Sequence, residues 1–401
     1  MLNALSNIFR RVFHGLIYLS LAFSLLVAVT LVWLWPSYDY LPVQSASLSV
    51  QRLSDGPIID TAMSPRLTAL AEEQGYSNIN GPSLIRVPDW VENPLGNYYL
   101  YFSHHKGDFI RLAYADKVEG PWSIYEPGAL TLKDSGFPSG NIPRLTLGEG
   151  LAELWNSVSI YLFRDSILAV YQAVVTDQEI RKQRGIASSQ TLKAHIASPE
   201  VVIDEANQQI VMFFHGQRDS LSQVSGVATS TNGLDFTASE KKLGAVYLRS
   251  FAYKDQYYFL AAPGILYRGD ELLGDYEPRG KSLFGNNTRH SAVLLQDDQL
   301  TVVWSRVGDA PERLLVSTVS LSSSDWDDWV PTHPTELLRA EQPWEGSELP
   351  WQPSLRGETN ERINDLRDPD IFVDVDGQVY LLYVAAGEQS IGVVGLNTTA
   401  P

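Results

Sequence analysis

Arg367-Asp368-Pro369-Asp370-Ile371-Phe372 is the stretch that decides the fold, because it begins a strand with charged residues and a proline and continues it with large apolar side chains. The same order recurs upstream in Ser198-Pro199-Glu200-Val201-Val202 and in Gly81-Pro82-Ser83-Leu84-Ile85. Each stretch is followed by an aromatic strand, such as Val379-Tyr380-Leu381-Leu382-Tyr383, and then by a third apolar run. A unit that recurs with the same internal order indicates a repeat architecture.

Two further units lack the proline but keep the order of strands. They begin at Leu248-Arg249-Ser250-Phe251 and at Arg289-His290-Ser291-Ala292-Val293. Antiparallel units of this kind cannot bury both faces singly, whereas a radial arrangement gives them shared cores and short edges. We therefore predict an all-β, five-bladed β-propeller over residues 76–401. A β-sandwich is the alternative, which the repeated first-strand motif disfavours.

One segment between the first two units breaks the pattern. Its apolar residues, in Ile160-Tyr161-Leu162-Phe163 and Ile167-Leu168-Ala169-Val170-Tyr171, are spaced more like those of a helix than those of a strand. We predict a short helical insertion over about residues 147–185, packed on the propeller. The alternative is a segment that docks onto a membrane or a partner.

Composition excludes several classes of function. The 401 residues carry a formal net charge of −17 and show no Lys/Arg cluster, which disfavours binding to nucleic acid. The chain has no cysteine, so disulfides, thiolate metal sites and thiol nucleophiles are excluded.

The N-terminus indicates a membrane anchor. Arg10, Arg11 and His14 precede an uncharged apolar stretch, which we expect to cross the membrane as a signal-anchor over residues 15–36. Residues 1–14 would then be cytoplasmic and residues 37–75 a linker. The C-terminal domain would be extracytoplasmic, in the periplasm. A cleaved signal peptide is the alternative, but no A-x-A site follows the apolar run.

The beginnings of innermost strands converge on the axis of a propeller, so their polar residues should share one funnel. These are Asn80, His195, Ser198, Glu200, Arg249, Arg289, His290, Arg367 and Asp368. The ends of second strands should add the rim residues His104, His105, Lys106, His215, Arg306 and Glu388. We predict that the histidines, the arginines and Asn80 of this set bind a substrate.

Several of these residues have an equally ordinary structural interpretation. Asp368 precedes a proline, where an aspartate also caps a turn. Glu200 is equally consistent with a partner for a neighbouring blade, and His290 with a core histidine. His104 and His105 are also consistent with a solvated turn. Arg249, beside Phe251, must either pair with an acid or meet a ligand.

The chain resembles glycoside hydrolases of family 43, of the arabinanase and β-xylosidase type, and their relatives. The resemblance lies in the blade starts at Gly81, Ser198 and Arg367, in the Gly120-Pro121-Trp122 ending and in the His290 start of blade four. The resemblance covers about residues 76–396. It implies a glycosidic bond cleaved in the axial funnel by two carboxyl groups, about 6.5–9.5 Å apart in inverting enzymes. It also implies that His290 helps to hold a central metal or water, and carboxylate and carbonyl oxygens suit Ca²⁺.

Blade one departs from that pattern, because Asn80-Gly81-Pro82 has no acid before its proline. If the protein is an enzyme, Asp368 is the expected base and Glu200 the expected acid, with Glu345 and Glu348 in reserve. Two hypotheses follow: a membrane-anchored, extracytoplasmic glycoside hydrolase, or a catalytically inactive propeller that binds a glycan or an envelope partner. In either case the arginines suit an anionic sugar.

Overall fold

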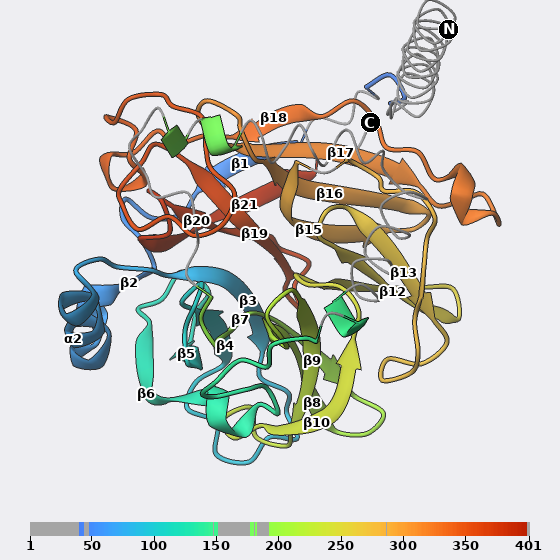
Figure 1. Ribbon diagram of the computed structural model, residues 1–401. Helices are drawn as coiled ribbons and strands as arrows, with labels where there is room; N and C mark the ends of the chain where they lie inside the picture. Colours follow the sequence, from blue (N-terminus) through green and yellow to red (C-terminus); the bar gives the residue numbers. More distant parts are fainter. Residues whose placement is uncertain are drawn as a thin grey trace, which may run out of the picture.

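The computed structural model describes residues 40–43, 48–146, 148–150, 177–179, 181–182, 192–285 and 287–398. Five antiparallel sheets are arranged around a common centre (Figure 1). Their innermost strands contact one another in the closed order β3, β7, β11, β15, β19 and back to β3. The prediction of an all-β, five-bladed propeller is confirmed.

Each blade contains four strands, which follow one another from the axis of the propeller outward. The innermost strands are β3 (Asn80–Arg86), β7 (Ile196–Asp204), β11 (Arg249–Tyr253), β15 (Thr288–Gln296) and β19 (Leu366–Val373). The second strands are β4 (Tyr98–Ser103), β8 (Gln209–Gln217), β12 (Gln256–Ala261), β16 (Gln299–Arg306) and β20 (Val379–Ala385). The third strands are β5 (Phe109–Ala115), β9 (Gln223–Ser230), β13 (Ile265–Gly269), β17 (Leu314–Ser320) and β21 (Ser390–Thr398). The outermost strands are β6 (Ser123–Thr131), β10 (Thr237–Leu243), β14 (Glu277–Pro278), β18 (Thr335–Leu338) and β1 (Leu48–Arg52).

The N-terminal strand closes the ring. β1 pairs antiparallel with β21, with Val50 opposite Leu396, and so supplies the outermost strand of the fifth blade. The short strand β2 (Ile59–Asp60) also pairs with β21. Between this strand and blade one lie η1 (Thr61–Met63) and α2 (Pro65–Gln74). Residues 37–75, expected as a linker, therefore include strands that are built into the propeller.

The hydrophobic core is divided into five clusters, each between two neighbouring blades. The period of two along a strand sends alternate side chains to the two sides of a blade. In β20, Tyr380 and Leu382 pack towards blade one, whereas Leu381 and Tyr383 pack towards blade four. The continuous apolar runs of the second strands follow from this burial on both faces.

A bulge interrupts the start of four innermost strands, and in three of them, β3, β7 and β19, it precedes a proline. Gly81, Ser198 and Asp368, each followed by proline, have φ of +59°, +49° and +49°, and the pairing with the second strand shifts there. The bulge is tightly packed at the axis, because a Cβ added to Gly81 would lie 2.8 Å from Cα of Ser198. Asp368 is therefore the structural counterpart of Gly81, which explains why blade one carries no acid at this position.

The remaining elements are the short helices η2 (Leu132–Asp134), η3 (Trp326–Asp328) and η4 (Pro343–Glu345). The expected membrane anchor over residues 15–36 lies outside the described residues. Of the expected insertion over 147–185, residues 148–150, 177–179 and 181–182 are described, and they are helical. Within the described ranges, no helix is both long enough and apolar enough to cross a membrane.

Candidate functional site

A single buried arginine, Arg249, occupies the middle of the axis. Its Nη2 donates to the carbonyl oxygens of Pro82 and Pro369 at 2.9 and 3.3 Å, and its Nη1 donates to Pro199 at 3.1 Å. Its Nε donates to the carbonyl oxygen of Ser291 at 3.1 Å. One guanidinium thus joins the innermost strands of the other four blades. Arg249 was expected to bind substrate, but its donors are taken up by the protein.

Two acids surround this guanidinium. Oε2 of Glu200 lies 2.7 Å from Nη1 of Arg249, and Oε1 of Glu200 accepts from the amide and the hydroxyl of Ser250 at 2.8 and 2.9 Å. Asp370 accepts from the amide of Leu84 at 2.9 Å, and burial raises its pKa to about 6. We call Arg249, Glu200 and Asp370 the axial plug. Both oxygens of Glu200 are engaged, which argues against its expected role as catalytic acid.

The plug also bears on the expected axial Ca²⁺. The blade-start carbonyl groups that could coordinate a cation instead accept hydrogen bonds from Arg249. Among the residues that the structure describes, no group of three or more His, Cys, Asp or Glu side chains is placed to hold a metal ion. The residues present on the axis therefore do not fit a calcium ion.

Next to the plug along β19 lies a buried aspartate–histidine pair. Nδ1 of His290 contacts the carboxylate of Asp368, and both side chains are buried. Oδ1 of Asp368 makes this contact, whereas its buried Oδ2 has no hydrogen-bond partner among the described groups. Burial acts to raise the pKa of Asp368, but His290 outweighs burial and holds the pKa below its ordinary value. Burial also lowers the pKa of His290. The pair therefore consists of a carboxylate and a neutral imidazole.

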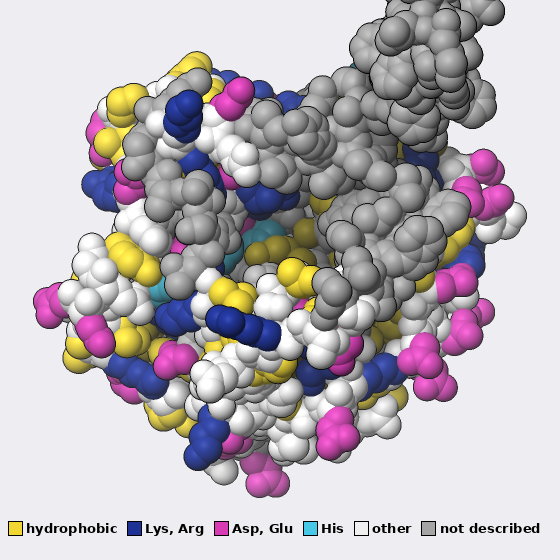
Figure 2. All heavy atoms as spheres, viewed as in Figure 1, with side chains coloured by type: hydrophobic (Ala, Val, Ile, Leu, Met, Phe, Trp, Pro, Cys, Tyr) yellow, Lys and Arg dark blue, Asp and Glu magenta, His cyan; other side chains and the backbone are white. Residues whose placement is uncertain are grey.

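A row of rings continues from this pair. Tyr247 lies between His290 and His215, with ring centroids 3.8 and 4.4 Å away, and the ring of His195 lies 5.7 Å beyond that of His215. Nε2 of His195, both ring nitrogens of His215 and Oγ of Ser198 are buried without hydrogen-bond partners. We define the axial site as Asp368, His290, Tyr247, His215, His195 and Ser198. Figure 2 shows histidine side chains in the hollow at the centre of the face towards the viewer.

Unpartnered polar atoms in a protein interior are rare and costly, so a cluster of them indicates that a ligand or water completes the site. Burial lowers the pKa of His195 to about 4 and that of His215 well below its usual value. Both imidazoles are therefore neutral near pH 7. His215 then offers one donor and one acceptor, whereas Nδ1 of His195 donates to the carbonyl oxygen of Lys193 at 2.8 Å and only its Nε2 is left, as an acceptor. Both suit a ligand with hydroxyl groups.

The blade-one residues expected in the site are held by protein partners. Nδ2 of Asn80 lies 3.1 Å from Nδ1 of His105, and Oδ1 of Asn80 accepts from the hydroxyl of Ser103 at 2.6 Å. Oε1 of Glu388 lies 3.3 Å from the same nitrogen of His105. His104 lies in the turn after β4, with Nε2 2.9 Å from Oε1 of Gln74. Asn80, His104 and His105 are therefore held in place by contacts within the protein.

The remaining predicted arginines are neutralised by acids. Arg289 makes a bidentate ion pair with the buried Glu312. Its Nε donates to Oε1 at 2.7 Å and its Nη2 to Oε2 at 3.1 Å. The buried Arg367 pairs with Asp365 and, at 3.1 Å, with Glu388. At the rim, Arg306 lies 2.9 Å from Asp309. The expectation of an arginine-rich site for an anionic sugar is therefore corrected, because the charges of these arginines are balanced within the protein.

Sequence reasoning missed a second carboxylate, Glu358, in the loop before blade five. Its Oε1 pairs with Nζ of Lys106 at 3.0 Å, whereas its Oε2 is buried without a hydrogen-bond partner. Its charge acts on His195, where it opposes the lowering of the pKa by burial. Among the described residues, Asp368 and Glu358 are the carboxylates that keep such an unpartnered buried oxygen.

The two reserve candidates have other positions. Glu345 is buried, contacts Arg52 of β1 and accepts hydrogen bonds from Tyr383 and from the amides of Glu341 and Gln342. It therefore fastens the ring-closing strand to blade five. Glu348 is exposed on the surface, 3.5 Å from Arg362.

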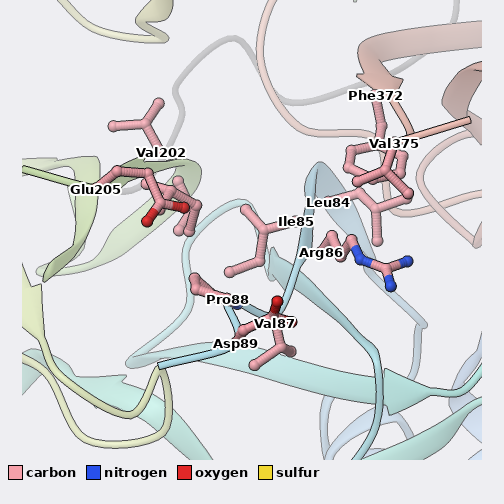
Figure 3. Close-up of a pocket in the computed structure, with 12 residues that line it drawn as sticks. Leu84, Ile85, Arg86, Val87, Pro88, Asp89, Val202, Glu205, Phe372 and Val375 are labelled. Atoms are coloured by element: carbon pink, nitrogen blue, oxygen red, sulfur yellow. The ribbon is translucent and has the colours of Figure 1, made fainter. Parts of the chain in front are cut away.

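A separate pocket of about 470 Å³ opens at the other end of the innermost strands. Figure 3 shows Phe372 and Val375 of the β19 region and Val202 and Glu205 of the β7 region, with Leu84 to Asp89 between them. Along β19 the order is Asp368 in the axial site, Asp370 in the plug and Phe372 at this pocket. The plug therefore separates the polar axial site from a largely apolar pocket.

Fold and site together define a five-bladed propeller with an incompletely satisfied polar site on its axis. No family model matches the chain. Over 339 residues the chain is 30% identical to the uncharacterized protein R118 of Acanthamoeba polyphaga mimivirus, a match that covers 78% of this chain and 82% of that protein. The chain belongs to the same protein family as this mimivirus protein.

Solved structures similar to this chain include family 43 glycoside hydrolases. A thermostable member is 12% identical, with a TM-score of 0.44 over 81% of this chain and 93% of that one. The GH43_1 enzyme of Xanthomonas citri in complex with xylose is 11% identical, with a TM-score of 0.47 over 87% and 91%. An exo-β-1,3-galactanase of Clostridium thermocellum is 10% identical, with a TM-score of 0.47 over 88% and 63%.

Proposed function

We propose that the protein binds a neutral carbohydrate in the axial site and hydrolyses a glycosidic bond there, with Asp368 and Glu358 as the two carboxyl groups. The observation that carries the proposal is that these two residues alone, among the described carboxylates, keep buried oxygens without hydrogen-bond partners. Glu200, the acid expected from the sequence, is replaced in this role by Glu358.

The roles follow from the surroundings of each group. Asp368 has a lowered pKa and is held against a neutral His290, so it is ionised and suited to take a proton from water as a general base. That water attacks the anomeric carbon, and the bond to the leaving oxygen breaks. Glu358 gives its proton to this oxygen; afterwards Asp368 releases the proton it took from water to solvent, and Glu358 is reprotonated from solvent.

The electrostatics of the site favour a neutral sugar over an anionic one. Arg249, Arg289 and Arg367 are each paired with buried carboxylates. In the axial site and at Glu358, the groups left without partners are neutral imidazoles, a serine hydroxyl and carboxylate oxygens. These groups hydrogen-bond to hydroxyls, whereas an added anion would meet the buried carboxylate of Asp368, whose contact is a neutral imidazole.

Carbohydrate binding without hydrolysis is the second candidate, and one observation favours it. Oε1 of Glu358 is already engaged in an ion pair with Nζ of Lys106 at 3.0 Å. A carboxylate held in an ion pair can accept hydrogen bonds from sugar hydroxyls but has no proton to donate to a leaving group. In that case the axial site recognises a glycan and releases it unchanged.

Sugar release from a panel of oligosaccharides tests the proposal. The panel contains neutral members and uronic-acid members, and the full-length protein is compared with Asp368→Asn and Asp370→Asn. Asp370 is the matched control, because it lies two residues along the same strand but belongs to the plug. We expect release from neutral members only, a loss of 100-fold or more in Asp368→Asn, and retained activity in Asp370→Asn. Binding without any release supports the second candidate, and neither binding nor release contradicts both.

We also propose that residues 15–36 anchor the protein in the cytoplasmic membrane with the propeller on the extracytoplasmic side. The support is the uncharged apolar stretch flanked by Arg10 and Arg11. Full-length protein should sediment with membranes, resist extraction by alkaline carbonate and dissolve in detergent. Release by carbonate alone would contradict the anchor.

A further inference from the structure

Tyr247 has a backbone conformation that is unusual for a large side chain. It lies between β10 and β11, two residues before Arg249, and its φ is +58°. For a bulky residue this left-handed conformation is disfavoured and persists only where the surrounding structure enforces it. Such residues cluster at functional sites, so the position calls for an explanation.

The other non-glycine residues with positive φ fall into two groups, those in connections between strands, among them Asn93, Ala386 and Glu388, and those at the bulges of innermost strands. Gln208, Lys254 and Asp297 lie in the tight turns that join first and second strands, where this conformation is ordinary turn geometry. Ser198 and Asp368 lie at the bulges of the innermost strands and belong to the axial site. Tyr247 belongs with the second group by position, because its ring lies against two histidines of that site.

The side chain is placed to meet a ligand. Its ring lies between those of His290 and His215. The centroid of the Tyr247 ring is 3.8 Å from that of His290 and 4.4 Å from that of His215. No described residue hydrogen-bonds to its hydroxyl, although Tyr247 remains partly accessible. Burial raises the pKa of this phenol, and the charge of Asp368 adds to the effect. The phenol is therefore a neutral hydrogen-bond donor near pH 7.

We propose that Tyr247 is a ligand-contacting residue of the axial site, whose phenol donates a hydrogen bond to a hydroxyl or ring oxygen of the bound sugar and so helps to set specificity. The inference rests on the proposed carbohydrate-binding function and names a contact within that site. The left-handed backbone conformation places the ring of Tyr247 between the two histidines.

A pair of conservative variants tests this role. Tyr247→Phe keeps the ring and its packing and removes only the unpartnered hydroxyl. The control is Tyr253→Phe on the adjoining strand β11, because the hydroxyl of Tyr253 donates to Asp298 and Leu321 at 2.8 and 2.9 Å and lies outside the axial site. Both variants are made in the full-length protein. Their dissociation constants for the best-bound oligosaccharide of the panel and their thermal unfolding midpoints are measured.

We expect Tyr247→Phe to weaken oligosaccharide binding by about 10-fold with an unchanged unfolding midpoint, because a hydrogen bond to the ligand is lost while the ring remains. Tyr253→Phe should lower the midpoint and bind as the wild type does. Equal binding by Tyr247→Phe and the wild type overturns this inference alone. A wild type that binds no member of the panel overturns the proposed function, and this inference with it.

Discussion

The axial plug and the axial site lie next to each other on the same innermost strands, yet they differ in how their polar groups are satisfied. Asp370 in the plug accepts a backbone hydrogen bond from Leu84, whereas Asp368, two residues earlier, contacts His290 through Oδ1 and keeps Oδ2 without a hydrogen-bond partner. Glu200 is fully bonded, whereas Ser198 on the same strand is not. The difference indicates that the plug stabilises the ring and the site is left incomplete for a ligand. The following predictions test this contrast.

The largest effect is expected from the plug. Arg249→Met removes four hydrogen bonds to backbone carbonyls and leaves Glu200 as a buried, unpaired charge. We expect a loss of about 3–5 kcal/mol in the free energy of unfolding, measured by urea denaturation. Arg306→Met at the rim is the control, because its ion pair is partly exposed and should contribute less than about 1 kcal/mol. Similar losses in both variants would contradict the role given to the plug.

The next effect is a pH dependence of stability caused by His195. Its pKa is lowered from 6.5 to about 4 in the folded state, so the unfolded state binds the proton more tightly. The stability of the folded state therefore falls as the pH drops from about 6.5 towards 4. For this group the loss is about 3 kcal/mol.

The variant His195→Gln lacks the titrating imidazole and should lose correspondingly less stability over this range. Urea denaturation of both proteins at pH 7 and pH 4 measures the difference, in which shared contributions such as that of Asp370 cancel. An identical pH dependence in the two proteins would show that His195 is not a buried neutral group.

The smallest effect is expected for a hydroxyl of the axial site. Ser198→Ala removes a buried oxygen that has no hydrogen-bond partner, so the free energy of unfolding should change by less than about 0.5 kcal/mol. Ser103→Ala is the matched control, because the hydroxyl of Ser103 donates to Asn80 at 2.6 Å and accepts from the amide of Ser198 at 3.0 Å. The control should lose about 1–2 kcal/mol. The reverse order of the two losses would argue against an incomplete site.

The fold was predictable because its signals are local. Each innermost strand starts with a polar or proline-containing segment, and each second strand is a continuous apolar run such as Val379 to Tyr383. The outermost strands were not predictable from this pattern, because β10, β14 and β18 are polar or very short. The pairing of β1 with β21 joins residues more than 300 positions apart, and no local pattern reports such a contact.

The site was predictable only in its location. Propeller topology places His195, His290 and Asp368 at one end of the axis, as strand starts, and the structure brings them together. Which charges pair depends on tertiary distances, so the sequence could not reveal that Arg249 binds Glu200 and four carbonyl groups. Tyr247 and Glu358 lie in connecting segments without periodicity, and no sequence signal singled them out.

The most direct test of the account is a comparison of kcat/KM for sugar release in Glu358→Gln and Glu200→Gln, measured well below the unfolding midpoint of each variant. We predict a loss of 100-fold or more for Glu358→Gln, because it removes a proton donor of the site. We predict a change of less than about threefold for Glu200→Gln, because Glu200 contacts Arg249 and Ser250 and no ligand. A large loss for Glu200→Gln with full activity in Glu358→Gln would contradict the account.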